Sequence, residues 1–553
     1  MVMSMEWVIR DGQVADGTGG AVYRADVRIG GGRIIEIGPN LRGENELSAE
    51  GAVVAPGFID IHTHYDAQIL WDPLVSPSCW QGVTSVVIGN CGFGIAPCRP
   101  GNEPLLVRTL EDLEDMPREA LEQGIRWDFR SFPEYLSCIR RSKPLLNIAA
   151  YIGHTPVRLE VMGEAAYERT ATEAEIGEMA KLVANAMQNG AIGFATSSAP
   201  TGRRCATRLA DEHEIVQLLL ELKKAGRGVA AFVPGGPNLS HRRLYELQHE
   251  IGRPFTWTAL LTMPTPEFRQ RIEIHKEFMK RGADVHPQVT CRPLIAQTTL
   301  RTAFALRTPC HLALEKSTDE VRLAAYSDSA WRQQLKVELK TTFQPPQWHK
   351  FVVVQSASKP QFNGLSIMEM SGKLTRDPVD CLFDLAVADR LDTRFQVTLA
   401  NDDEAAVREL LVLKGTVMGL SDAGAHPDQI CDAVMPVDLL ANWVRGRNAL
   451  SLEAAVHKLT GEPAAMFGLD RGLIKVGMPA DITVFVPDAI GVGPIRRVRD
   501  LPAGAERLIA DQPTGIRHVF VNGVAIRTDG RQLDLLPDAR PGEVLAPAHC
   551  ASG

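Results

Sequence analysis

The chain has 553 residues, of which 45% are apolar and 23% are charged, and its net charge is -8. These values are typical of a globular protein with one large domain and smaller parts, and the weak net charge argues against a dedicated nucleic-acid surface. No apolar run reaches the ~18 residues of a membrane span, and the ten cysteines lack the paired spacing of a disulfide framework. We therefore expect a cytoplasmic enzyme with a small-molecule substrate and neither a nucleic-acid nor a membrane partner, and we leave a homo-oligomer open.

The two ends of the chain have the same character. Residues 7–39 alternate short apolar runs with Gly- and Asp-rich turns, and residues 480–488 and 517–530 do the same. This pattern is typical of small antiparallel strands. It predicts one composite β-sandwich built from residues 1–55 and 469–530, followed by a tail over residues 531–553. Two unrelated hairpins are the alternative.

The middle of the chain, residues 56–468, alternates short apolar strands with helical patterns. Eight strands are predicted, at residues 57–63, 84–90, 146–154, 191–198, 228–236, 255–261, 284–293 and 416–422. This order predicts an α/β fold of the (β/α)8 TIM-barrel type. A doubly wound open sheet is disfavoured because no Gly-rich phosphate loop opens a strand–helix turn. Residues 294–415 are too many for one crossover helix, so we expect a helical insertion before the last barrel strand.

Two of the predicted helices have clear boundary signals. Thr172 and Glu175 form a capping-box pattern before the fourth strand, and the apolar residues that follow recur at helical spacing. Another helix, with Ile215 and Leu222 on its apolar face, is expected to end at Gly226.

Polar residues follow several of the predicted strands, where a barrel places its chemistry. His62 and His64 come directly after the first strand, and alternation along a strand puts both on one face, where they can grip one metal ion. A single residue of this kind is weak evidence for a functional site, but several that converge on one rim of the barrel are stronger evidence. The remaining candidates are Cys91, His154, His286, Gln288, Arg292, Asp422 and His426. Three further histidines lie within helical patterns and are expected at the surface: His213, His275 and His457.

The motifs at these positions resemble a known family. They read PGFIDIHTHYD from Pro56, GNCGFG from Gly89, GHTPVR from Gly153 and SDAGAH from Ser421. Together with the β-rich ending, they resemble the N-acyl-D-amino-acid deacylase (D-aminoacylase) branch of the amidohydrolase superfamily. The resemblance implies a metal-dependent barrel that hydrolyses an amide or related C–N bond. It also implies four metal ligands: His62, His64, Asp422 and, for this branch, Cys91.

The sequence departs from the pattern of that branch. The branch supplies a histidine at the ends of strands 5 and 6, but this chain has none at either place, and its fourth strand lacks the lysine that bridges two metals in some members. His241 lies several residues beyond strand 5 and is a poor substitute by position. We therefore predict one tightly bound divalent ion per chain, zinc in particular, with a second ion weak or absent. The alternative is recruitment of ligands from the insertion, which contains His311 and His349.

Roles for the other residues follow from their chemistry. Asp422 is expected to take a proton from water and pass it to the leaving nitrogen. His154 is assigned to the catalytic group as an oxyanion donor or as an orienting residue, with a structural hydrogen bond as an equal alternative. Arg292, Gln288 and Arg158 are candidates for substrate binding, although for Arg158 we favour a structural role.

Three functions remain open. We favour a metal-dependent hydrolase of an N-acyl amino acid, D-configured in the implied branch, or of a similar small molecule. The second is a cyclic amide or imide hydrolase, or a deaminase, on the same fold. The third is a non-catalytic binding protein, against which the retention of four convergent ligands argues.

Overall fold

A computed structural model describes residues 6–198, 204–236, 238–263, 265–302, 306–342 and 345–547. The chain forms two compact units. The first contains Met1–Arg292, Asp403–Pro427 and Cys431–Gly553, and the second contains Pro293–Asp402 and Asp428–Ile430. No described helix is both long and apolar enough to cross a membrane.

The first unit contains a parallel sheet of eight strands in the order β16-β12-β11-β10-β9-β8-β7-β6. All eight predicted strands are present: β6 (Phe58–Asp60), β7 (Val83–Ile88), β8 (Asn147–Gly153), β9 (Gly193–Ser197), β10 (Val229–Val233), β11 (Phe255–Trp257), β12 (Val285–Val289) and β16 (Val417–Met418). A parallel bridge from Thr63 to Ala423 joins the segments that follow the first and last strands. The sheet is therefore a nearly closed barrel, and the predicted fold class is confirmed.

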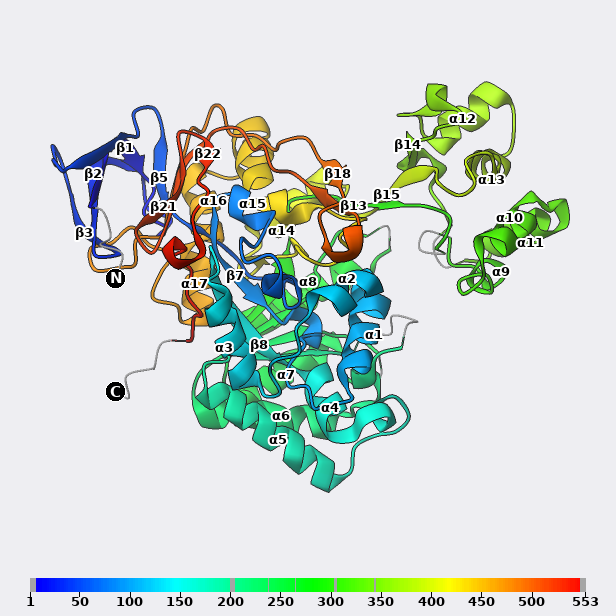
Figure 1. Cartoon of the computed structure of the whole chain (residues 1–553), viewed down its shortest axis with the longest axis horizontal. Helices are drawn as coiled ribbons and strands as arrows, with labels where there is room; N and C mark the ends of the chain where they lie inside the picture. Colours follow the sequence, from blue (N-terminus) through cyan, green and yellow to red (C-terminus); the bar gives the residue numbers. More distant parts are fainter. Residues whose placement is uncertain are drawn as a thin grey trace. The chain divides into compact units, whose positions relative to one another are not determined.

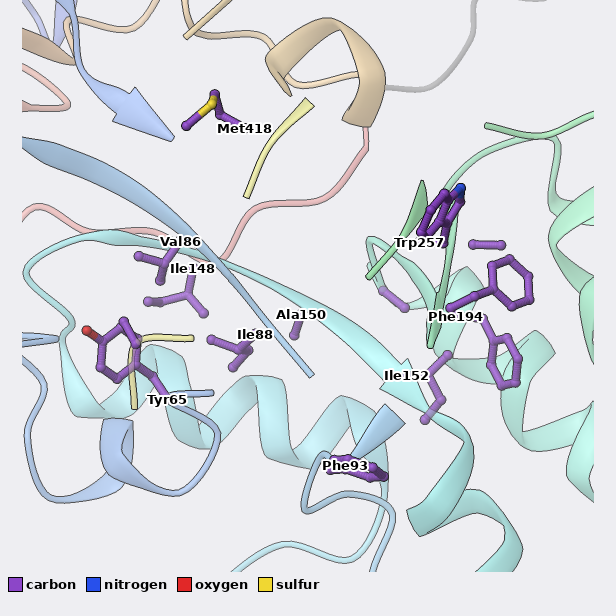
Figure 2. Close-up of a cluster of buried hydrophobic side chains, with 14 of the residues drawn as sticks. Tyr65, Val86, Ile88, Phe93, Ile148, Ala150, Ile152, Phe194, Trp257 and Met418 are labelled. Atoms are coloured by element: carbon purple, nitrogen blue, oxygen red, sulfur yellow. The ribbon is translucent and has the colours of Figure 1, made fainter. Parts of the chain in front are cut away.

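Alternate side chains of the barrel strands belong to two separate buried clusters. Ile148, Ala150 and Ile152 of β8 pack in a cluster that also contains residues of the surrounding helices, whereas Ala149 and Tyr151 belong to the other cluster. Figure 2 shows part of the first cluster. This alternation follows from the two-residue period of a strand. It explains why the strands read as continuous apolar runs, since both faces are covered.

The two helices with boundary signals begin and end as predicted. The side chain of Thr172 caps α5 (Glu173–Gln188) in a complete capping box with Glu175. Helix α6 (Glu212–Ala225) ends at Gly226, which has the left-handed backbone conformation that glycine tolerates. Both helices lie on the outside of the barrel (Figure 1).

Both chain ends build one mixed sheet, which confirms that the two ends join, although the prediction was a β-sandwich. Its order is β22-β21-β20-β17-β5-β1-β2-β3, with β4 paired to β1. The N-terminal strands are β1 (Trp7–Val14), β2 (Tyr23–Gly30), β3 (Arg33–Gly38), β4 (Asn45–Ser48) and β5 (Val53–Pro56). The C-terminal strands are β17 (Ile482–Phe485), β20 (Ile516–Val521), β21 (Val524–Thr528) and β22 (Arg531–Gln532). Strand β5 pairs antiparallel with β17, which joins the two ends of the chain.

The second unit contains helices, as expected of the insertion, and also a sheet that the sequence did not predict. Its helices are α9 (Pro309–Leu312), α10 (Asp319–Ser327), α11 (Ser329–Leu339), α12 (Ile367–Leu374) and α13 (Pro378–Ala388). Strands β13 (Leu294–Thr298), β15 (Arg394–Ala400) and β14 (Phe351–Gln355) form an antiparallel sheet in that order. A separate buried core, which includes Tyr326, Phe383 and Phe395, holds this unit together.

One of the surface predictions is wrong. His275, on α8 (Glu267–Met279), is fully buried. Its Nδ1 lies 2.9 Å from the hydroxyl of Tyr245, and its Nε2 lies 2.8 Å from the carbonyl oxygen of Lys414. A polar ring can be buried when both nitrogens have partners, so the helical pattern gave no sign of it.

Candidate active site

The first two site residues lie in the segment after β6. His62 and His64 are 1% and 3% exposed, and their ring centroids are 5.3 Å apart. The backbone N–H of His64 donates to the carbonyl oxygen of Ala423 at 2.7 Å, and the hydroxyl of Ser421 donates to the carbonyl oxygen of His62 at 3.0 Å. These bonds fix the first loop of the barrel against the last.

Cys91 lies in the turn η3 (Asn90–Gly92) that follows β7. Its backbone is left-handed, with φ 56°, an unusual conformation for a cysteine. The side-chain amide of Asn90 stabilises the turn by donating to the carbonyl oxygens of Val87 and Thr63 at 2.8 and 3.2 Å. Backbone conformations of this kind concentrate at functional sites. Here the turn brings the thiol within 3.6 Å of His62 Nε2.

Asp422 follows the last barrel strand and completes the group. Its Oδ1 lies 3.1 Å from His62 Nε2 and 3.7 Å from His64 Nε2. Among the described residues, His62, His64 and Cys91 form the group whose potential metal-binding atoms all lie within 4.8 Å of one another. The structure thus brings together the four residues that the resemblance implies as ligands.

The charge states of these groups differ strongly. Burial lowers the pKa of His62 to about 4 and raises that of the Cys91 thiol to about 11. Burial also lowers the pKa of His64, but Glu114, Asp422 and Cys91 outweigh it, so this pKa lies well above its usual range. Burial acts to raise the pKa of Asp422, but the neighbouring His62 and His64 hold it below its usual range. Asp422 is therefore ionised at neutral pH.

This donor set fits a zinc ion. Two imidazole nitrogens and a thiol sulfur lie within 4.8 Å of one another, and the carboxylate oxygen of Asp422 lies beside both imidazoles. All four side chains are buried or partly buried. A mixed nitrogen, sulfur and oxygen set suits Zn²⁺ better than Mg²⁺ or Ca²⁺, which prefer oxygen alone.

Residues outside this group hold the two histidines. Gln288 on β12 places its Oε1 2.6 Å from His62 Nδ1, and the hydroxyl of Thr258 lies 3.2 Å from the same nitrogen. Glu114 places its Oε1 3.6 Å from His64 Nδ1. Thus both histidines direct Nε2 toward Asp422. The sequence pointed to Gln288, as a substrate-binding residue, but gave no signal for Thr258 or Glu114.

His154 and Arg158 lie together in a buried polar cluster on α4 (His154–Met162). His154 Nδ1 lies 2.7 Å from the hydroxyl of Thr196, and its Nε2 lies 2.7 Å from Glu214 Oε1. Arg158 is fully buried, with its Nε 3.4 Å from the same carboxylate oxygen. Both ring nitrogens of His154 thus have protein partners, which favours the alternative of structural hydrogen bonds. Catalysis by His154 and substrate binding by Arg158 stay predictions.

Arg292, the other predicted substrate-binding arginine, follows β12. Its Nε donates to Asp432 at 2.7 Å, and its Nη1 donates to Asp438 at 3.0 Å. Two carboxylates already neutralise this guanidinium, so a substrate carboxylate would have to share it. Its predicted role stays a prediction. His286 on β12 pairs with Asp284 at 2.8 Å.

The other histidines considered as ligands lie elsewhere. His241 begins α7 (His241–Ile251), and its ring meets the edge of Trp257 with centroids 4.8 Å apart. His311 hydrogen-bonds to Leu306 and Tyr326 within the second unit. Residues 199–203, which follow β9, lie outside the described residues.

Comparison with known proteins agrees with the metal-binding geometry described above. A model of the amidohydrolase family matches residues 45–526. The chain belongs to the amidohydrolase family. It is an enzyme of this family acting on carbon–nitrogen bonds other than peptide bonds, and its resemblance to D-aminoacylases is confirmed.

Relatives with named activities match this amidohydrolase over almost its whole length. An N-acyl-D-aspartate deacylase of Alcaligenes xylosoxydans xylosoxydans is 28% identical over 98% of this chain and 95% of its own length. The structure of a D-aminoacylase, described with a binuclear metal centre activated by one metal and attenuated by the second, has a TM-score of 0.67 at 24% identity, covering 98% and 100% of the two chains. An N-acyl-D-glutamate deacylase from Bordetella bronchiseptica, solved with zinc and a phosphonate inhibitor, has a TM-score of 0.66 at 24% identity and the same coverage.

Proposed function

We propose that this amidohydrolase is a zinc-dependent deacylase of N-acyl-D-amino acids. The observation that carries the proposal is the convergence of His62, His64, Cys91 and Asp422 at the carboxyl ends of barrel strands. The activities of the relatives support the substrate class, and the zinc in one related structure supports the metal.

The four residues would hold the ion, with the imidazoles as neutral donors, Cys91 as a thiolate, and Asp422 bound loosely enough to leave one position open for water. When bound, zinc lowers the pKa of a water molecule to about 7 and polarises the carbonyl that is attacked. The carboxylate of Asp422 is ionised and 27% exposed, so it can reach a substrate atom. It accepts a proton from water and delivers it to the amide nitrogen as the C–N bond breaks. The products are a carboxylic acid and an amine.

Turnover of paired enantiomers tests the proposal. We expect the zinc-loaded enzyme to release acid and amine from N-acetyl-D-amino acids, the acidic ones included, and to leave the matched L-enantiomers intact. Enzyme dialysed against a chelator is the control and should be inactive until zinc is restored. A single ring-opened product from a cyclic amide, or release of ammonia, would point to the alternative chemistry instead.

We also expect one tightly bound zinc ion per chain. His62, His64, Cys91 and Asp422 supply donors for one ion, whereas the segments that follow β10 and β11 lack the histidines that the branch uses for another. Elemental analysis after dialysis against metal-free buffer measures the ratio. A value near two ions per chain would contradict the prediction and show that other residues build a second site.

Zinc affinity should rise steeply with pH. In the metal-free protein His64 and Cys91 hold protons at neutral pH, because their pKa values are raised, whereas His62 and Asp422 hold none. Binding must displace these protons, so affinity increases as pH rises, by up to about 100-fold per pH unit if both are released. Chelator competition at several pH values measures this slope. An affinity independent of pH would show that His64 and Cys91 do not bind the ion.

A further inference from the structure

The end of helix α1 (Glu103–Glu114) carries two consecutive carboxylates, and each faces a histidine. Glu114 Oε1 lies 3.6 Å from His64 Nδ1, and Asp115 Oδ2 lies 2.7 Å from His426 Nδ1. The backbone N–H of His426 also donates to the carbonyl oxygen of Glu114 at 2.7 Å. The helix end therefore contacts both the loop after β6 and the loop after β16.

Electrostatics disfavours a carboxylate at this position. The C-terminal end of a helix is the negative end of its dipole and favours cations. The last turn of α1, which the structure describes in full, contains no basic residue. Glu114 is also only 3% exposed, and a buried carboxylate is costly unless positive charge compensates it. Its ion-pair partner is His64, so positive charge on that ring, or on a cation bound to it, compensates the carboxylate.

The two histidines of the site are held by groups of different charge. The partner of His62 Nδ1 is the neutral amide oxygen of Gln288, at 2.6 Å, whereas the partner of His64 Nδ1 is a carboxylate. A carboxylate that accepts the proton of one ring nitrogen makes the other nitrogen a stronger donor to a metal. His64 Nε2 faces Asp422 across 3.7 Å, on the side where the ligands converge.

We propose that Glu114 is a positioning residue for zinc binding. It holds the His64 ring with its proton on Nδ1, and its negative charge strengthens donation from Nε2. The charge of the ion in turn compensates the buried carboxylate. The inference rests on the proposed function, since it assumes that the ion binds at His62, His64, Cys91 and Asp422.

Zinc dissociation constants of three proteins test the inference: wild type, Glu114→Gln and Glu119→Gln, measured by chelator competition at several pH values and corrected for the proton that zinc displaces from His64. Glutamine keeps the shape of Glu114 and an oxygen that can face His64 Nδ1, so the substitution removes the charge alone. We expect zinc to bind 10- to 100-fold more weakly to Glu114→Gln. Glu119, on α2 (Arg118–Gly124), is exposed, and the same change there should leave the affinity unaltered.

A conservative variant separates positioning from a structural role. Glu114→Asp keeps the negative charge, but its side chain is shorter by one methylene, so the carboxylate lies farther from His64. Its zinc affinity should therefore lie between those of wild type and Glu114→Gln. Two results would overturn the inference: Glu114→Gln binds zinc as tightly as wild type, or it binds zinc more tightly than Glu114→Asp does. A lower melting temperature of the metal-free variant would not change this conclusion. Wild-type protein that binds no zinc would instead overturn the metal site of the proposed function, and the inference with it.

Discussion

Replacement of Asp422 by asparagine should lower turnover at least ~10³-fold, because it removes an essential proton acceptor that also lies among the metal ligands. The carboxylate faces both histidines, at 3.1 Å from His62 Nε2 and 3.7 Å from His64 Nε2. Steady-state kinetics on an N-acyl-D-amino acid, with zinc present in excess, measures the loss.

The fold should tolerate this change. Asp422 has a left-handed backbone with φ 46°, and asparagine adopts this conformation about as readily as aspartate does. The melting temperature of Asp422→Asn should therefore stay close to that of wild type. Asp534→Asn, the same chemical change at an exposed position, is the matched control for activity. Near-normal turnover in Asp422→Asn would refute the assigned role.

Replacement of Cys91 by alanine should weaken zinc binding at least ~100-fold, because it removes a sulfur that binds the ion directly. Loss of a residue that only supports a ligand already weakens metal binding about 10- to 100-fold. With Co²⁺ in place of zinc, the variant should also lack the thiolate-to-metal charge-transfer absorption. Thiol labelling is a poor substitute for these measurements. Burial raises the pKa of Cys91 to about 11, so the thiol reacts slowly even without the ion.

Cys310 provides the matched control for this substitution. Like Cys91, it is partly exposed, but it lies in the second unit beside Thr308. Cys310→Ala should leave zinc affinity and the cobalt spectrum unchanged. If Cys91→Ala retains full metal content and full activity, then Cys91 only packs the turn after β7.

The sequence predicted the barrel well because its signals are local. Each strand is a short apolar run, and the rule that barrel chemistry lies at the carboxyl ends of strands converts that order into a list of candidates. His62 and His64 were therefore found from one strand and its period, and Cys91 and Asp422 from the motifs that resemble those of the family. The structure brings these four together.

What the sequence missed depends on tertiary contacts. Glu114 lies in an acidic stretch, LEDLED, which reads as a solvated helix face, and only packing against the loop after β6 buries it. His275 looked exposed because its partners, Tyr245 and Lys414, are distant in sequence. Strands β14 and β15 went unseen for the same reason, since helices separate them along the chain.

The contact between the segments that follow the first and last barrel strands has a consequence for chain entropy. A contact between His62 and Asp422 closes a loop of about 360 residues, and the entropic cost of closure grows only with the logarithm of that length. Pro293–Asp402, the main segment of the second unit, lies within this loop. Without that segment the loop would be shorter by almost a third, yet its closure would be easier by only about 0.3 kcal/mol. The site is thus nearly indifferent to the length of the insertion, which leaves this segment free to vary between relatives without loss of the ligand set.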